Sequence, residues 1–162
     1  MKGPTMTAPE TQFTAAPGSL DMTSTAVLDA PVEAVFRAHT EQDAFTRWWG
    51  PRELTAKVEA FEPRAGGSWR IVQVDPGGGE YAFNGVFHLV TPTRIVRTFE
   101  FEGVPGHVSM QTTTFEDVDG RTRVTDHAVF QSVEDRDGMK DTGAEQFAPV
   151  GMAQLEEVAQ SL

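Results

Sequence analysis

The spacing of apolar residues divides the chain into regions with different expected structure. Residues 1–18 are rich in Pro, Thr, Ala and Gly, follow no apolar period and contain one aromatic residue, Phe13. A segment of this composition buries too little apolar surface to order itself, so we expect a disordered N-terminal tail over residues 1–18. Residues 19–162 are then expected to form one domain. Its first segment, "LDMTSTAVLDA", mixes Leu, Met and Val with β-branched Thr and predicts a strand.

Two short helices are expected after this first strand. In "DAPVEAVFRAHT", Pro31 suits the first helical turn and apolar residues recur at helical spacing. The next segment, "EQDAFTRWW", is expected to be a second helix that presents Phe45, Trp48 and Trp49 and ends at a Gly-Pro pair. We expect Trp48 to pack this helix against the sheet and Trp49 to lie nearer the rim of any cavity.

From residue 54 the apolar period becomes two and remains so for most of the chain. Segments with this period are separated by Gly, Pro and Asp turn signals, and they cover residues 54–62, 67–75, 80–90, 93–103, 107–118 and 121–131. Short connections join antiparallel neighbours. With the first strand, the chain is therefore expected to form a curved antiparallel sheet of about seven strands.

Residues 132–162 have the pattern of one long helix. Its apolar stripe consists of Met139, Gly143, Phe147, Val150, Leu155, Val158 and Leu162. Pro149 is expected to kink this helix without ending it. A curled sheet needs a cover for its concave face, and the long helix supplies one. The expected fold class is α+β, with the sheet wrapped around the C-terminal helix and two short helices after the first strand.

Strand alternation identifies the face of the sheet that is expected to point inward. On successive strands this face carries Tyr81, Phe83, Gly85, Phe87 and Leu89, then Ile95, Phe99 and Phe101, then Val108, Met110, Thr112 and Thr114. The large rings lie opposite Gly143 and Gly151 of the helix, which fits either close packing or a pocket beneath the helix. For a pocket, the expected ligand-binding residues are Trp69, Phe83, Phe87, Phe99, Phe101, Met110, Thr112, Phe147 and Met152.

Two charged residues also fall on the inward face by strand parity. Arg97 lies between Ile95 and Phe99, and Asp126 lies between Val124 and Ala128. An unpaired buried charge is costly, so the two residues are candidates for the polar end of a cavity, where they orient a ligand or act as general acid and base. The alternative is a β-bulge that shifts the register, or a position near the open ends of the strands.

Composition excludes several classes of function. The 162-residue chain has no Cys, 13 basic and 24 acidic residues, and a net charge of −11. Such a charge repels nucleic acid and anionic lipid, and no segment has the length of a membrane span. The four His residues lack metal-ligand spacing, and "DPGGGE" is a hairpin turn without the features of a phosphate loop. We expect a cytoplasmic protein, monomer or homodimer, with no metal, cofactor or nucleic-acid partner.

Several segments resemble one known family. They are "DAPVEAVFRAHTEQDAFTRWWGP", "VEAFEPRAGGSWR", "GEYAFNGVF", "RIVRTFEFEG", "HVSMQTTTFED", "GRTRVT" and "SVEDRDGM". In this order they are similar to the heat-shock chaperone ATPase activator homologue (AHSA-type) family of the START-like (SRPBCC) superfamily. The resemblance implies a helix-grip domain around a hydrophobic cavity over residues 19–162, with no shared set of catalytic residues. The chain departs from the family pattern at His39, where relatives commonly have Trp, and at Pro149.

Three classes of function remain open from the sequence. The leading hypothesis is binding of a small hydrophobic or amphipathic molecule in a cavity between the sheet and the C-terminal helix. A second is a chaperone-associated interaction protein, for which the outer sheet surface and the loops would matter. A third is an enzyme of the cyclase or hydrolase kind that uses Arg97 and Asp126. It ranks last because the sequence has neither a nucleophile-base pair nor a cofactor motif.

Overall fold

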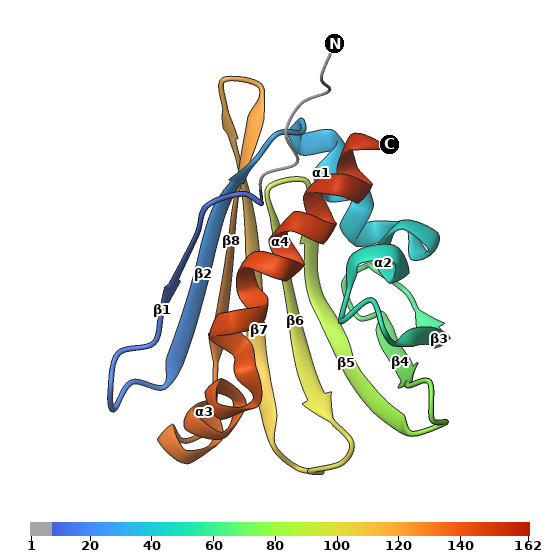
Figure 1. Ribbon diagram of the computed structural model, residues 1–162, viewed down its shortest axis with the longest axis vertical. Helices are drawn as coiled ribbons and strands as arrows, with labels where there is room; N and C mark the ends of the chain where they lie inside the picture. Colours follow the sequence, from blue (N-terminus) through green and yellow to red (C-terminus); the bar gives the residue numbers. More distant parts are fainter. Residues whose placement is uncertain (1–7) are drawn as a thin grey trace.

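The protein folds into an antiparallel sheet with a long helix lying across one face, as the computed structural model shows for residues 8–162 (Figure 1). The strands are β1 (Thr11–Thr14), β2 (Asp21–Leu28), β3 (Thr55–Phe61), β4 (Ser68–Val74), β5 (Glu80–Thr91), β6 (Arg94–Phe101), β7 (Val108–Val118) and β8 (Arg121–Val129). The helical elements are α1 (Val32–Thr40), α2 (Gln42–Trp48), α3 (Val133–Met139), η1 (Lys140–Ala144) and α4 (Glu145–Gln160).

All neighbouring strands pair antiparallel, in the order β1-β2-β8-β7-β6-β5-β4-β3. The meander from β3 to β8 follows sequence order, and β2 closes its far side by pairing with β8. Helix α4 crosses the concave face, while α1 and α2 pack against α4 and each other near one end of the sheet (Figure 1). This arrangement confirms the predicted α+β helix-grip fold.

The sheet has an eighth strand within the segment that was expected to be a tail. Strand β1 pairs with β2, with Thr11 opposite Ala26. The β-branched Thr residues around Phe13 favour an extended chain, and the open edge of β2 supplies backbone partners that composition alone does not reveal. Part of the expected tail, residues 1–7, lies outside the described residues.

The C-terminal segment is two helices rather than one. Its division lies at Gly143, whose φ of 102° interrupts the helical backbone after α3, whereas Pro149 remains inside α4. Only Gly adopts such a φ without steric strain, so this glycine sets the bend. The predicted apolar stripe is wrong at two positions, because Val150 is 46% exposed and Leu162 is 36% exposed.

Strand faces differ from the expected alternation at two places. A β-bulge after Phe87 shifts the β5–β6 register, so that Val90, rather than Leu89, packs against the core. On β7 the inward residues are Gln111, Thr113 and Phe115, not the expected set with Met110 and Thr112. The run of three Thr residues gives the two faces of β7 nearly equal polarity, so their difference in the sequence was too small to assign the face.

Hydrogen bonds fix the short helices to the rest of the domain. The indole Nε1 of Trp48 donates to the Ala38 carbonyl oxygen over 2.7 Å, which joins α2 to α1. Buried Gln154 of α4 donates to the carbonyl oxygens of Trp48 and Gly50, at 2.8 and 2.9 Å. The end of α2 is therefore held against α4. No helix among the described residues is long and apolar enough to cross a membrane.

Candidate functional site

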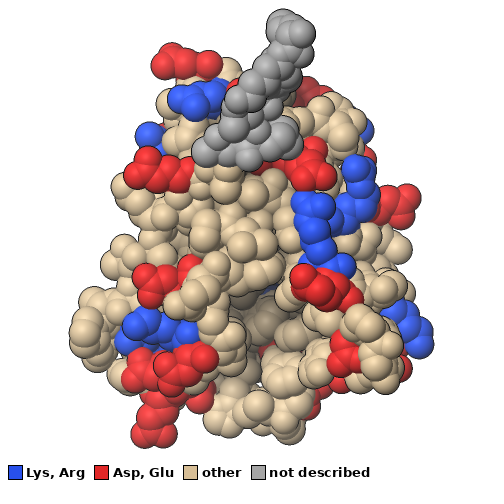
Figure 2. Space-filling view, in the orientation of Figure 1, with Lys and Arg blue, Asp and Glu red and all other residues tan. Residues whose placement is uncertain are grey.

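A cavity of about 520 Å³ lies between the concave face of the sheet and the helices that cover it. Residues of β2, β5, β6, β7 and β8 line one side, and residues of α1, α2, α4 and the α3–α4 bend line the other. Figure 2 shows a hollow on the face that carries α4, on the β5 side of that helix. The helix therefore fills only part of the space above the concave face of the sheet.

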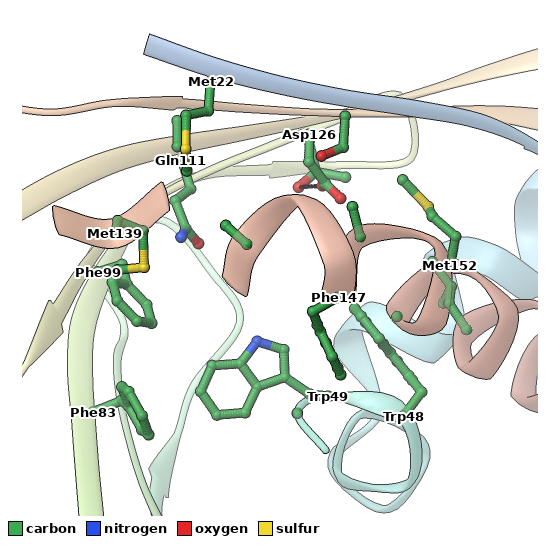
Figure 3. A pocket seen from close by; sticks show the side chains of 18 of the residues that line it. Met22, Trp48, Trp49, Phe83, Phe99, Gln111, Asp126, Met139, Phe147 and Met152 are labelled. Atoms are coloured by element: carbon green, nitrogen blue, oxygen red, sulfur yellow. Dashed lines mark hydrogen bonds between the residues drawn. The ribbon is translucent and has the colours of Figure 1, made fainter. Parts of the chain in front are cut away.

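Aromatic rings and thioethers form most of the apolar lining. Five of the expected ligand-binding residues are among the lining residues: Phe83, Phe87, Phe99, Phe147 and Met152. Figure 3 shows how Phe83 and Phe99 of the sheet, Phe147 and Met152 of α4 and Met139 of α3 surround the same space. Such a wall favours the apolar part of a small molecule.

The other expected lining residues lie outside the cavity. Trp69 is only 1% exposed and lies beneath the surface, where its Nε1 donates to the Thr98 carbonyl oxygen over 3.2 Å. Gly85 makes room for this ring, because a Cβ there would lie 2.5 Å from the indole nitrogen. Phe101 packs against Phe83 at the end of β6, with the ring centroids 5.2 Å apart, and is not a lining residue.

Met110 and Thr112 are placed on the outer face by the alternation of β7 described above. The side chain of Met110 is 47% exposed, so it contributes nothing to the cavity wall. The residues that take their place are Gln111 and Thr113. The cavity is therefore more polar along β7 than the sequence indicated.

Two glycines help to leave the space open on the helix side. Gly143 and Gly151 both line the cavity, and neither supplies a side chain to fill it. A Cβ on Gly151 would meet the Phe147 ring at 3.2 Å, closer than an ordinary contact. The glycines of the helix and the aromatic residues of the sheet were expected to face each other, and they lie around the same cavity.

Both tandem tryptophans border the cavity, in different ways. Trp48 is anchored by its hydrogen bond to α1, whereas the Trp49 ring meets Trp69 and Phe83 edge to face at 5.7 and 5.5 Å. Figure 3 shows the indole nitrogen of Trp49 directed into the cavity. Trp49 therefore offers a hydrogen-bond donor inside an otherwise aromatic wall.

Arg97 brings a positive charge into the site. Its guanidinium carbon lies 4.6 Å from the ring centroid of Trp69, 5.5 Å from that of Phe45 and 5.9 Å from that of Trp49. Cation–π contacts with these three rings stabilise the positive charge. Its Nε donates to the Gln111 side-chain oxygen over 3.3 Å. Burial lowers the pKa of Arg97 to about 10, although the field of Asp126 opposes this. The side chain remains cationic at neutral pH.

Asp126 brings a negative charge to another part of the cavity. Its Oδ1 accepts a hydrogen bond from Thr113 over 2.8 Å, marked by the dashed line in Figure 3. The surrounding protein raises the pKa of Asp126 by desolvating its carboxylate, and this outweighs the Thr113 hydrogen bond and the attraction of Arg97. Although protein atoms lie around its carboxylate, Asp126 remains exposed to the open cavity, so a ligand can reach it.

His39 is a cavity residue that the sequence marked only as a departure from a family pattern. Its Nδ1 lies 2.8 Å from the Val35 carbonyl oxygen, an acceptor only, so this nitrogen carries the proton. Burial lowers the pKa of His39 to about 4, and the positive charge of Arg97 adds to the shift against the Val35 hydrogen bond. The imidazole is therefore neutral at physiological pH.

The cavity holds its two charged groups at separate positions. The described residues contain no group of three or more His, Cys, Asp or Glu side chains able to hold a metal ion. The Arg97 guanidinium is held among aromatic rings, and Asp126 accepts a hydrogen bond from the Thr113 hydroxyl. The arrangement is an apolar chamber with separate cationic and anionic positions.

The family model described as Activator of Hsp90 ATPase homolog 1-like protein matches residues 29–160. The chain belongs to this family. It is thereby a member of the SRPBCC (START-like) superfamily, as the resemblance implied. A search of curated proteins found no significant match.

Solved structures of several bacterial proteins share the fold of this family member. Protein Ms6760 from Mycobacterium smegmatis is 25% identical with a TM-score of 0.78, over 91% of this chain and 96% of that one. A protein from Arthrobacter aurescens is 24% identical with a TM-score of 0.84, over 93% and 92%. One from Rhodobacter sphaeroides is 22% identical with a TM-score of 0.84, over 94% and 100%. The similarity extends along nearly the whole domain.

Proposed function

We propose that this protein binds a small amphipathic molecule in the cavity beneath α4. The observation that carries the proposal is a 520 Å³ space with an aromatic wall and charged side chains facing it. A solid core would bury rings against rings, whereas here Phe147 and Phe99 border open volume (Figure 3). Cavities of a few hundred Å³ with few polar groups are typical of small-molecule sites.

Polar groups within the wall support an amphipathic rather than a purely apolar ligand. Asp126, Gln111 and the Trp49 indole nitrogen all face the cavity (Figure 3). Groups of this kind lose water when an apolar molecule fills the space, and the loss is costly unless the ligand supplies partners. A ligand with an apolar body and one or two polar groups therefore fits best.

Titration with Nile red, a neutral dye that fluoresces in apolar surroundings, tests the proposal. The variant Ala148→Phe places a large ring in the cavity, because Ala148 lines it from α4. The matched control, Val150→Phe, adds the same ring at an exposed position of the same helix. We expect saturable binding to the wild type and to Val150→Phe, and loss of binding in Ala148→Phe.

Two other outcomes of the dye titration would favour the alternative hypothesis, an interaction with a chaperone. Equal dye binding by all three proteins would place the dye on the surface, and no binding by any of them would leave the cavity without a role. Either result would favour the interaction hypothesis, in which the outer sheet face and the loops contact a chaperone. A chaperone pull-down with the wild type would then be the next measurement.

A further inference from the structure

The Asp126 carboxylate has hydrogen-bonding capacity that the described residues do not use. Only Oδ1 has a recorded partner, the Thr113 hydroxyl, and no described Lys, Arg or His forms an ion pair with this carboxylate. A carboxylate accepts several hydrogen bonds, and Asp126 has its remaining acceptor capacity on the side of the cavity that it lines. Desolvation of the carboxylate raises the pKa of Asp126 in the same direction as a missing partner would. The Asp126 carboxylate can therefore accept further hydrogen bonds from a donor that occupies the cavity.

Arg97 is held too far away to be that donor. It pairs across the sheet with Gln111, while Asp126 pairs with Thr113 on the other side of β7. From strand spacing of about 4.8 Å and a rise of about 3.3 Å per residue, the two Cα atoms are roughly 12 Å apart. The guanidinium also turns away from β8, towards the rings of Trp69 and Phe45. The cavity therefore contains two separate charged positions.

We propose that the ligand is a hydrophobic amine whose ammonium group pairs with Asp126 and whose apolar body lies against the aromatic wall. This inference rests on the proposed function, because it names the ligand class for the same cavity. An ammonium group supplies both the donors and the charge that the carboxylate lacks. The net charge of −11 also attracts cations from solution. At the other end, Arg97 and Gln111 accommodate acceptor groups on the ligand.

Three molecules with one skeleton test the inference: 4-phenylbutylamine, 4-phenylbutanol and 4-phenylbutanoate. Displacement of Nile red gives their affinities. Because a charged hydrogen bond is stronger than a neutral one, we expect the amine to bind about tenfold more tightly than the alcohol, and the carboxylate to bind most weakly. The variant Asp126→Asn should reduce amine binding to the level of the alcohol and leave alcohol binding unchanged.

The control variant Asp43→Asn removes one negative charge from the exposed surface of α2. It should retain the preference for the amine, which separates local pairing from the overall field of the protein. If Asp126→Asn does not fold, Asp126→Thr, a neutral residue suited to a strand, replaces it. Tightest binding by 4-phenylbutanoate, lost in Arg97→Met, would overturn the inference in favour of an anionic ligand. Equal affinities for all three molecules would also overturn it while leaving dye binding, and the proposed function, intact.

Discussion

Replacement of His39 by Phe should remove a large part of the acid sensitivity of this protein. The His39 ring packs 4.7 Å from Trp48 and 4.9 Å from Phe115, contacts that a Phe ring of similar shape keeps. Its polar contact is the Nδ1 hydrogen bond to the Val35 carbonyl oxygen, which as a helix carbonyl also belongs to the backbone ladder of α1. The substitution therefore removes the titrating group with little change in packing.

The magnitude follows from the pKa of His39, which burial lowers from 6.5 to about 4. In the unfolded chain the imidazole takes up a proton as the pH falls through 6.5, whereas the folded protein resists protonation until about pH 4. The stability that neutral His39 contributes is thus complete above pH 6.5 and is lost as the pH falls towards 4. At 1.36 kcal/mol per pKa unit, the loss is roughly 3 kcal/mol.

Urea denaturation between pH 7.5 and pH 4 measures this effect. The quantity of interest is the free energy of unfolding of the wild type minus that of His39→Phe, because other acids and bases titrate equally in both. We expect this difference to fall by about 3 kcal/mol across the range. The matched control His88→Phe introduces the same ring at an exposed position, and its difference from the wild type provides the baseline for comparison. A flat difference for His39→Phe would refute a desolvated, neutral imidazole at this site.

Three further predictions, which use five substitutions, have distinct expected outcomes. The raised pKa of Asp126 means that its ionisation destabilises the folded state, so Asp126→Asn should raise the melting temperature at pH 7. This gain should vanish below pH 3.8, because the Asp side chain of the wild type is then as neutral as the Asn side chain of the variant. Gly143→Ala should destabilise by about 1–2 kcal/mol in urea denaturation because φ is 102°, whereas Gly138→Ala, in a helical and unobstructed position of α3, should stabilise. Trp69→Ala should cost about 3–5 kcal/mol, and Trp49→Ala should cost less because its ring already borders open space; equal losses would argue for a filled cavity.

Much of the fold was predictable because hydrophobic periodicity is local. The change from helical spacing to a period of two after Pro51 marks the passage from α2 to the sheet, and the turn residues separate the strands. Strand β1 was not predictable in this way. Its stability comes from pairing with β2, a contact between segments that composition does not encode.

The cavity could be anticipated only in part. Arg97 and Asp126 stand out because a charge on an apolar face is rare, and the structure places both at the cavity. The Thr-rich strand β7 offered no such contrast, so Gln111 was missed and Met110 was expected in its place. Whether space remains between a sheet and a helix depends on how closely the two approach, and the bend at Gly143 that sets this approach is a backbone property.

The indole N–H signals of the three tryptophans provide the most direct measurement of cavity binding. Single Trp→Phe variants assign these signals in two-dimensional proton–nitrogen NMR spectra. The spectra are then recorded while 4-phenylbutanol is added to the protein. Trp49 directs its nitrogen into the cavity, whereas the nitrogens of Trp48 and Trp69 are hydrogen-bonded to Ala38 and Thr98. We predict a large, saturable shift of the Trp49 signal, small shifts of the other two, and no shift of any in Ala148→Phe. An unchanged Trp49 signal at saturating ligand would contradict a ligand-binding cavity beneath α4.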